Sequence, residues 1–140
     1  MFRKNILLVD SDPGSSKLIV SLLYAEHVPV NVVSACSLEE ARRQTGAHHV
    51  DLIVLDYCFE DGTGVEFCRE LYRKGSACPV VFFTALSREV DKRTALANGC
   101  SAYLIKPDDI DRLVPVVTRQ LRISLGRSSV GRRRTGRAII

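Results

Sequence analysis

Four apolar runs of this 140-residue chain are each followed closely by a side chain that could take part in chemistry. Asp10 and Asp12 follow the first run, Asp56 ends the second, Thr84 ends the third and Lys106 ends the fourth. If the runs are parallel strands of one sheet, their carboxyl ends share one crevice, where carboxylates, a hydroxyl and an ammonium would meet. The sequence therefore predicts one site assembled from residues that lie far apart along the chain.

These side chains suit the transfer of a phosphoryl group to a carboxylate. A carboxylate is a weak nucleophile, yet it accepts a phosphoryl group when the charge in flight is neutralised and the reacting atoms are held in line. Asp56 is the predicted acceptor. Lys106 would bring a mobile positive charge to one phosphoryl oxygen, and the Thr84 hydroxyl would donate to a second. A hard divalent cation, Mg²⁺ before others, would bridge Asp56 and the acids after the first run, because it favours oxygen ligands in octahedral geometry.

The elements that must position these side chains are short β-rich runs that alternate with segments of helical length. We predict five strands, at Asn5–Asp10, Val30–Ser34, Asp51–Asp56, Pro79–Thr84 and Ala102–Lys106. Their apolar residues are too continuous for a sheet with one face in water, and such runs are typical of parallel strands covered on both faces. Helices are predicted at Ser15–Glu26, Leu38–Thr45, Gly64–Lys74, Arg88–Asn98 and Asp109–Leu125. Five βα units with right-handed crossovers close into an α/β fold with a doubly wound, five-stranded parallel sheet.

Local signals mark some of the helix ends and one loop. Ser37 followed by Glu40 predicts a capping box at a helix start. Pro115 removes one backbone donor and clashes with the preceding turn, so the last helix should begin late or bend. Gly62 and Gly64 are assigned to the backbone geometry of a loop, since the chain has no GxGxxG or Walker sequence.

Charge divides the chain into a body and a tail. The 140 residues carry 20 Lys and Arg against 16 Asp and Glu, a net charge of +4. Five of the arginines and no acid lie in residues 125–140, so the rest of the chain holds 15 basic and 16 acidic residues. We predict one domain over residues 1–124, large enough to bury a core without disulfides, and a flexible basic tail over residues 125–140.

The cysteines and the start of the chain indicate an intracellular protein. The five cysteines are an odd set without CxxC spacing, and we expect reduced core thiols rather than disulfides or a metal site. The opening residues contain no apolar stretch with the length of a signal peptide or a membrane span. The predicted protein is soluble and cytoplasmic, with no insertion into membranes.

Four sequence motifs stand at the ends of the predicted strands. They are Leu7-Leu8-Val9-Asp10-Ser11-Asp12-Pro13, Val54-Leu55-Asp56 followed by Glu60-Asp61-Gly62-Thr63-Gly64, Phe82-Phe83-Thr84-Ala85, and Tyr103-Leu104-Ile105-Lys106-Pro107. Together, over about residues 4–124, they resemble the receiver domains of two-component response regulators, in particular single-domain receivers of the chemotaxis type. The resemblance implies a flavodoxin-like (βα)5 fold with strand order 2-1-3-4-5.

The resemblance also implies roles for the residues at the site. Asp56 would accept a phosphoryl group from a histidine kinase or a histidine phosphotransfer protein. The Mg²⁺ ligands would be Asp10, Asp56 and the backbone carbonyl of Cys58. Thr84 and Lys106 would act on the phosphoryl group, and the Lys106-Pro107 peptide bond would be cis.

A switch and an output surface follow from the same resemblance. On phosphorylation Thr84 would move inward and Tyr103 would fill the vacated space, shifting a two-state equilibrium. A downstream protein would bind the face made by helix four, strand five and helix five. Cys58 and Leu86 would flank the path of the water that hydrolyses the phosphoryl group. The chain would catalyse only its own phosphorylation and dephosphorylation, so we do not predict an enzyme in any wider sense.

Ser11 departs from the family pattern, in which two adjacent acids follow the first strand and the second binds the metal. Asp12 could replace the missing ligand only if the chain has left the strand by then, because side chains alternate along a strand. Asp12 or Ser11 is therefore an open candidate ligand, and we expect weaker Mg²⁺ binding rather than none. Taken alone, Asp10 or Asp12 could instead cap a helix that starts at Pro13.

Other functions stay open. The chain could be the receiver part of a longer response regulator with a missing output domain, which a reading frame continuing beyond Ile140 would show. Ser11 leaves room for a phosphorylation-independent pseudo-receiver that acts as an interaction module, although the retained Asp56, Thr84 and Lys106 argue against it. A small redox protein is disfavoured because no phosphate-cradling loop follows the first strand. The body is not predicted to bind nucleic acid directly, and for the tail this stays open, since its arginines lack aromatic residues for stacking.

Overall fold

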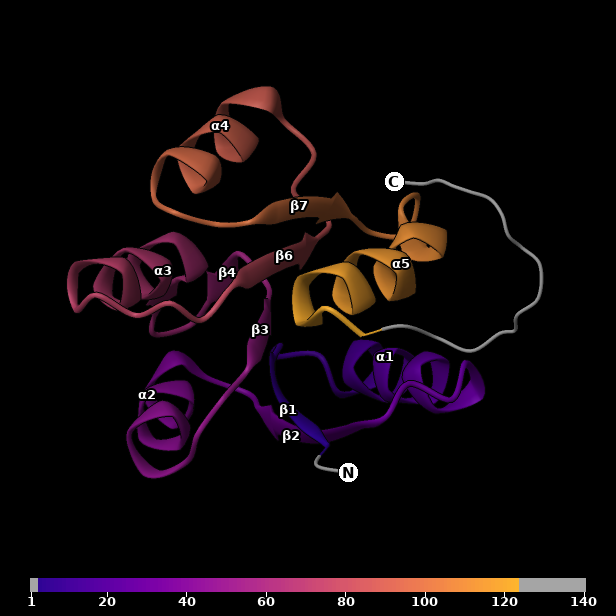
Figure 1. Ribbon diagram of the computed structural model, residues 1–140. Helices are drawn as coiled ribbons and strands as arrows, with labels where there is room; N and C mark the ends of the chain where they lie inside the picture. The colour runs from indigo at the N-terminus through magenta and orange to yellow at the C-terminus, as the bar shows by residue number, and fades with distance from the viewer. Residues whose placement is uncertain (1–2, 124–140) are drawn as a thin grey trace.

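The computed structural model describes residues 3–123, and its centre is a five-stranded parallel sheet (Figure 1). The strands are β1 (Lys4–Val9), β2 (Val30–Ala35), β3 (Leu52–Leu55), β6 (Val80–Thr84) and β7 (Ala102–Ile105). They are hydrogen-bonded in the order β2-β1-β3-β6-β7, and every pair is parallel. The predicted doubly wound sheet with strand order 2-1-3-4-5 is confirmed, when these five strands are numbered along the chain.

Helices cover both faces of this sheet (Figure 1). They are α1 (Pro13–Ala25), α2 (Leu38–Ala47), α3 (Gly64–Arg73), α4 (Glu89–Ala97) and α5 (Ile110–Leu121). Helices α1 and α5 lie on one face, and α2, α3 and α4 lie on the other. Apolar residues run continuously along β3 and β6 because both faces of these strands are buried under helices.

Alternate residues of β1 point into two separate cores, and this alternation sets the register of the sheet. Leu8 packs in the core beneath α1 and α5, whereas Val9 packs in the core beneath α2, α3 and α4. A shift by one residue would exchange the two sets, so burial on both faces fixes the register. Val9 is paired with Leu55 of β3, which brings the next residues, Asp10 and Asp56, level with each other at the carboxyl edge.

A short antiparallel hairpin, β4 (Cys58–Phe59) with β5 (Gly62–Thr63), follows β3 and was not predicted. Each of its strands has two residues, too few for a period-two pattern to show in the sequence. Gly62 has a φ of 143°, a region that side chains rarely adopt, and a Cβ on Gly64 would overlap the backbone oxygen of Asp56. The two glycines therefore serve the backbone geometry of this loop, as the sequence indicated.

The starts of α1 and α2 both depend on capping side chains. α1 begins at Pro13, earlier than predicted, because the Asp12 carboxylate accepts a hydrogen bond from the first turn of the helix. At α2 the predicted box is half present, since Ser37 Oγ accepts from the Glu40 N–H. The Glu40 carboxylate accepts instead from the N–H of Cys36, one residue before the expected partner.

The last helix contains Pro115 within its span. α5 begins at Ile110, one residue later than predicted, and Pro115 lies inside it. It ends at Leu121, where Arg122 takes a left-handed conformation with a φ of 57°. The predicted end at Leu125 lies outside the described residues.

The remaining predictions about organisation are tested only in part. The predicted basic tail, residues 125–140, and the predicted domain boundary at residue 124 lie outside the described residues. Within residues 3–123, no helix is long and apolar enough to cross a membrane. The five cysteines are free: Cys68 and Cys100 are buried, Cys78 is half-buried, and Cys36 and Cys58 are exposed. The expectation of core thiols therefore holds for three of the five.

Candidate functional site

Two carboxylates and one ammonium meet at the carboxyl edge of the sheet. Asp10 follows β1, Asp56 follows β3 and Lys106 follows β7. Lys106 Nζ lies 2.7 Å from Asp10 Oδ2 and 3.2 Å from Asp56 Oδ2, although 96 and 50 residues separate it from these acids in the sequence. The structure thus brings three of the predicted site residues into direct contact. The Lys106-Pro107 peptide bond beside them is cis.

This charged cluster is largely shielded from water. The side chains of Asp10, Asp56 and Lys106 are 2%, 18% and 18% exposed. Burial opposes the charge on Lys106, but the hydrogen bond to Asp10 and the charge of Asp56 outweigh burial, so the pKa of Lys106 is raised. Lys106 is therefore an ammonium at neutral pH. One positive charge faces two carboxylates, and the imbalance favours a further cation.

The second oxygen of each carboxylate is held by the backbone. Asp10 Oδ1 accepts from the N–H of Asp12 at 2.9 Å, and Asp56 Oδ1 accepts from the N–H of Tyr57 at 2.7 Å. These bonds fix the rotation of both carboxyl groups. Each group therefore presents its Oδ2 to the same ammonium, that of Lys106.

Thr84 and Tyr103 are joined through the backbone of a third residue, Leu86. Thr84 ends β6 and is buried, and its Oγ1 accepts from the Leu86 N–H at 3.2 Å. Tyr103 lies in β7, and its hydroxyl donates to the Leu86 carbonyl at 2.7 Å. The loop after β6 is thus held from both sides. Sequence reasoning missed this contact, because a bond to a backbone group leaves no mark on the identity of Leu86.

Tyr103 occupies an inward position in the core under α2, α3 and α4. Its ring stacks on Phe82 with centroids 5.6 Å apart and meets Tyr57 edge-on at 6.5 Å. Its side chain is buried, and burial raises the pKa of its hydroxyl well above the usual range. Tyr103 is therefore a neutral donor to Leu86 at physiological pH.

Ser11 and Asp12 are not part of the contact that Lys106 makes with Asp10 and Asp56. Both residues are exposed, and the Asp12 carboxylate caps α1. Within residues 3–123, no group of three or more His, Cys, Asp or Glu side chains is placed to hold a metal ion. The oxygens of Asp10 and Asp56 suit a hard cation that keeps most of its water ligands, as Mg²⁺ does. Cys58 lies on β4 with its backbone paired to Thr63.

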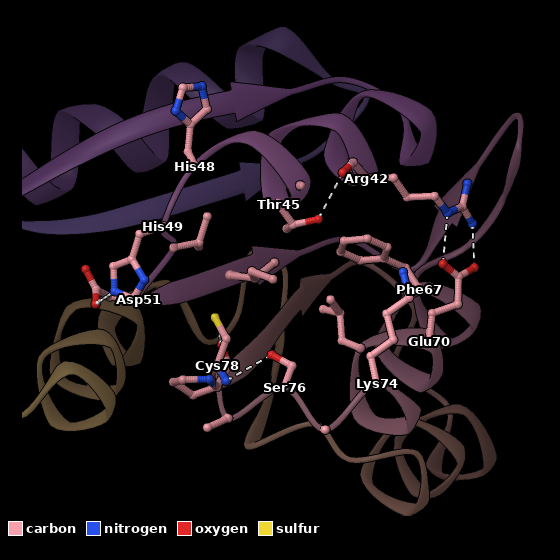
Figure 2. Close-up of a pocket in the computed structure, with 17 residues that line it drawn as sticks. Arg42, Thr45, His48, His49, Asp51, Phe67, Glu70, Lys74, Ser76 and Cys78 are labelled. Atoms are coloured by element: carbon pink, nitrogen blue, oxygen red, sulfur yellow. Dashed lines mark hydrogen bonds and ion pairs between the residues drawn. The ribbon is translucent and has the colours of Figure 1, made fainter.

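A cavity of about 640 Å³ lies away from this cluster, beside the ends of α2 and α3 (Figure 2). Its wall contains the ion pair of Arg42 with Glu70 at 2.8 Å and a hydrogen bond between the His49 ring and the Asp51 carboxylate at 2.9 Å. None of the candidate site residues lines it. The cavity is therefore separate from the carboxylates and the ammonium that the sequence predicted.

Comparison with known proteins gives the family. A family model described as response regulator receiver domain matches residues 6–118. KDP operon transcriptional regulatory protein KdpE of Escherichia coli (strain K12) is 34% identical over 125 residues, which cover 89% of this chain and 52% of KdpE. Transcriptional regulatory protein YvrH of Bacillus subtilis (strain 168) is 37% identical over 107 residues, which cover 76% of this chain and 44% of YvrH. The chain spans about half the length of these curated relatives.

Solved structures give the same result. A two-component response regulator from Clostridium difficile matches with a TM-score of 0.78 and 28% identity, covering 86% of this chain and 97% of that one. Response regulator protein TrrA from Thermotoga maritima, solved in complex with Mg²⁺-BeF, matches with a TM-score of 0.73 and 26% identity over 84% and 98% of the two chains. The fold and the clustered site thus define a signalling receiver. This chain belongs to the family of response regulator receiver domains, which are phosphorylation-activated modules of two-component systems.

Proposed function

We propose that this chain is a signalling receiver that accepts a phosphoryl group on Asp56 from a histidine kinase or a histidine phosphotransfer protein. The observation that carries the proposal is the contact of Lys106 with both Asp10 and Asp56, because it sets a cation beside the acceptor at the edge of the sheet. Asp56 is the acceptor rather than Asp10 because its side chain is 18% exposed, whereas that of Asp10 is 2% exposed. The more exposed carboxylate is the one that a phosphodonor reaches more easily.

Mg²⁺ is the proposed cofactor. Asp10, Asp56 and the backbone carbonyl of Cys58 would hold it, and Asp12 or Ser11 is the candidate for a further ligand. The bound cation would supply positive charge to the phosphoryl oxygens. The structure of TrrA with Mg²⁺-BeF supports a metal in a similar protein.

In the proposed transfer Asp56 is the nucleophile, and Lys106 and Thr84 stabilise the charge on the phosphoryl oxygens. A bond forms between an Asp56 oxygen and the phosphorus as the bond between the phosphorus and the donor breaks. Lys106 already contacts Asp56, so its ammonium can follow the negative charge onto a phosphoryl oxygen while it keeps Asp10 as a partner. The Thr84 hydroxyl can turn its proton to another phosphoryl oxygen.

The proposed switch is the backbone of Leu86, held by Thr84 and Tyr103. If Thr84 turns toward the phosphoryl group, the bond from the Leu86 N–H to Thr84 Oγ1 is strained or lost. Tyr103 already lies inward in this structure, so phosphorylation would stabilise this arrangement rather than create it. The face formed by α4, β7 and α5 would then bind a downstream protein, and we place this exchange in the cytoplasm.

One observation favours a second candidate, the receiver part of a longer regulator. The relatives KdpE and YvrH carry the printed name transcriptional regulatory protein, and the matched region covers 52% and 44% of them. In that case the same phosphorylation at Asp56 would control an output domain that lies outside this chain. The chemistry proposed for the site is the same for both candidates.

Intact-mass measurement tests the proposal. We expect the chain to gain the mass of one phosphoryl group after incubation with a small-molecule phosphodonor and Mg²⁺, and to gain little when a chelator removes the metal. A chain that gains no phosphoryl group at any Mg²⁺ concentration would instead be a phosphorylation-independent interaction module.

A further inference from the structure

A carboxylate outside the charged cluster ties the loop after Asp56 to the start of α2. Asp61 Oδ1 accepts from the N–H of Leu38 at 3.2 Å, and Asp61 Oδ2 accepts from the N–H of Glu39 at 3.0 Å. These are the first N–H groups of α2, which no carbonyl of the same helix can bind. The two bonds lower the pKa of Asp61. Asp61 therefore caps a helix that lies more than 20 residues away in the sequence.

This tie acts on the hairpin that carries Cys58, whose carbonyl is the proposed backbone ligand. Asp61 lies in the turn between β4 and β5, and Cys58 is paired with Thr63 across that hairpin. Thr63 caps α3, and the Gly64 N–H donates to the Tyr57 carbonyl at 2.7 Å. The segment after Asp56 is thus held at two helix starts, by Asp61 at α2 and by Thr63 at α3.

The start of α2, to which the turn is hydrogen-bonded, is anchored in the core. Leu38, the first residue of α2, is fully buried in the core under α2, α3 and α4. A Cβ on Gly62, the residue after Asp61, would lie 3.1 Å from the Leu38 side chain. The turn therefore packs directly against α2. This contact and the two hydrogen bonds of Asp61 fix the position of the turn relative to α2.

We propose that Asp61 is a positioning residue for phosphoryl transfer, which holds the Cys58 carbonyl where it can bind Mg²⁺. This inference rests on the proposed function of the chain. Asp61 acts through the hairpin, because both of its carboxylate oxygens are bound to α2. Ser11 stands where the family has a second acid, so only two clustered carboxylates and a backbone carbonyl would bind the cation. The position of that carbonyl should therefore affect Mg²⁺ binding more strongly than in a receiver with both acids.

The Mg²⁺ dependence of phosphorylation in Asp61→Ala tests the inference. We expect the half-saturating Mg²⁺ concentration, measured with a small-molecule phosphodonor, to rise about tenfold, as when an outer partner of a metal ligand is lost. Asp61→Asn keeps one acceptor oxygen and should recover part of the loss. Glu60→Ala is the matched control: it removes the same charge from the neighbouring, exposed position and should leave the Mg²⁺ dependence unchanged.

A second control separates positioning from the stability of α2. Ser37 is the N-cap residue of α2, and its Oγ accepts a hydrogen bond from the Glu40 N–H at 3.1 Å. Ser37→Ala removes this bond. It should weaken the same helix start without changing the Mg²⁺ dependence. Amide hydrogen exchange in the metal-free protein gives a readout besides activity. Exchange at Gly64, whose N–H donates to the Tyr57 carbonyl across the hairpin, should quicken in Asp61→Ala and stay unchanged in Ser37→Ala.

The outcomes separate this inference from the function on which it rests. If the wild-type chain is phosphorylated and Asp61→Ala shows the same Mg²⁺ dependence, the inference is overturned and the function stands. An equal rise in Ser37→Ala would assign the effect to α2 alone and would also overturn the inference. A wild-type chain that takes no phosphoryl group would overturn the proposed function, and the positioning role of Asp61 with it.

Discussion

The ion pairs at the carboxyl edge of the sheet and in the wall of the cavity are equally close, but their surroundings differ. At the carboxyl edge of the sheet Lys106 lies 2.7 Å from Asp10, whose side chain is 2% exposed. In the wall of the cavity Arg42 lies 2.8 Å from Glu70, with side chains 42% and 39% exposed (Figure 2). The distances are nearly equal, so distance alone does not show which pair belongs to a functional site.

Charge balance and burial make the distinction. Arg42 and Glu70 form a complete pair, in which two guanidinium nitrogens meet two carboxylate oxygens. Such an exposed pair contributes about 1 kcal/mol or less to stability. The buried cluster is incomplete, because Lys106 alone faces both Asp10 and Asp56. Burying an unbalanced set of charges is costly, and such sets gather where chemistry requires them.

Removal of Lys106 should give the largest effect on the rate. In Lys106→Met we expect phosphorylation by a small-molecule phosphodonor to slow about a hundredfold, since a lost charge at the site of developing negative charge costs about that much. The rate is measured by intact mass over time at saturating Mg²⁺. A variant that stays folded and reacts as fast as the wild type would show that the ammonium only balances charge.

The second-largest effect should be on the lifetime of the phosphorylated state, when the residues at positions 58 and 86 are changed. Neither the Cys58 nor the Leu86 side chain orients water well, and Leu86 is bulky, so phospho-Asp56 should be long-lived. Cys58→Asn combined with Leu86→Glu should speed phosphate release about tenfold, the effect of about 1.4 kcal/mol in the barrier. Phosphate release is followed from the isolated phosphoprotein in Mg²⁺. Loss within seconds in the wild type, unchanged by the double substitution, would contradict this prediction.

Ser11→Asp should strengthen Mg²⁺ binding several-fold. The substitution restores a carboxylate beside Asp10, and each added negative charge in a partly buried site attracts the cation, although crowding of the acids limits the gain. Calorimetric titration of the unphosphorylated protein measures the affinity. Tight binding in the wild type with no gain in the variant would mean that Asp12 already supplies the missing ligand despite capping α1.

The exposed pair should give the smallest effect. Arg42→Ala should lower the free energy of unfolding by about 1 kcal/mol or less, because water screens the pair and solvates both partners once it is broken. Urea unfolding measures the change, and the phosphorylation rate should stay at the wild-type value. A large loss of that rate would link the cavity of Figure 2 to the charged cluster.

The sequence predicted the sheet and the meeting of Asp10, Asp56 and Lys106 for one physical reason. Continuous apolar runs favour a parallel sheet with both faces covered, and the topology of such a sheet brings strand ends together. The place of Asp12 could not be predicted in the same way. It depends on where the chain leaves β1, and the helix start at Pro13 takes its carboxylate as a cap.

Hydrogen bonds to backbone groups could not be predicted from the sequence either. The hydrogen bonds of Thr84 and Tyr103 to Leu86 use its N–H and carbonyl, which every residue but proline has. The capping of α2 by Asp61 was missed because caps are recognised by adjacency, and this one comes from a hairpin too short to show in the sequence pattern. Side-chain patterns thus indicated the participants at the site, whereas the structure was needed for the bonds that hold them.

Mapping of the phosphorylated residue shows whether Asp56 is the acceptor. The chain is phosphorylated with a small-molecule phosphodonor and Mg²⁺, the acyl phosphate is trapped by reduction, and the modified residue is identified by peptide mass spectrometry. We expect modification at Asp56 alone, and no adduct in Asp56→Asn. Modification at Asp10 or another acid, or an adduct of unchanged yield in Asp56→Asn, would contradict it.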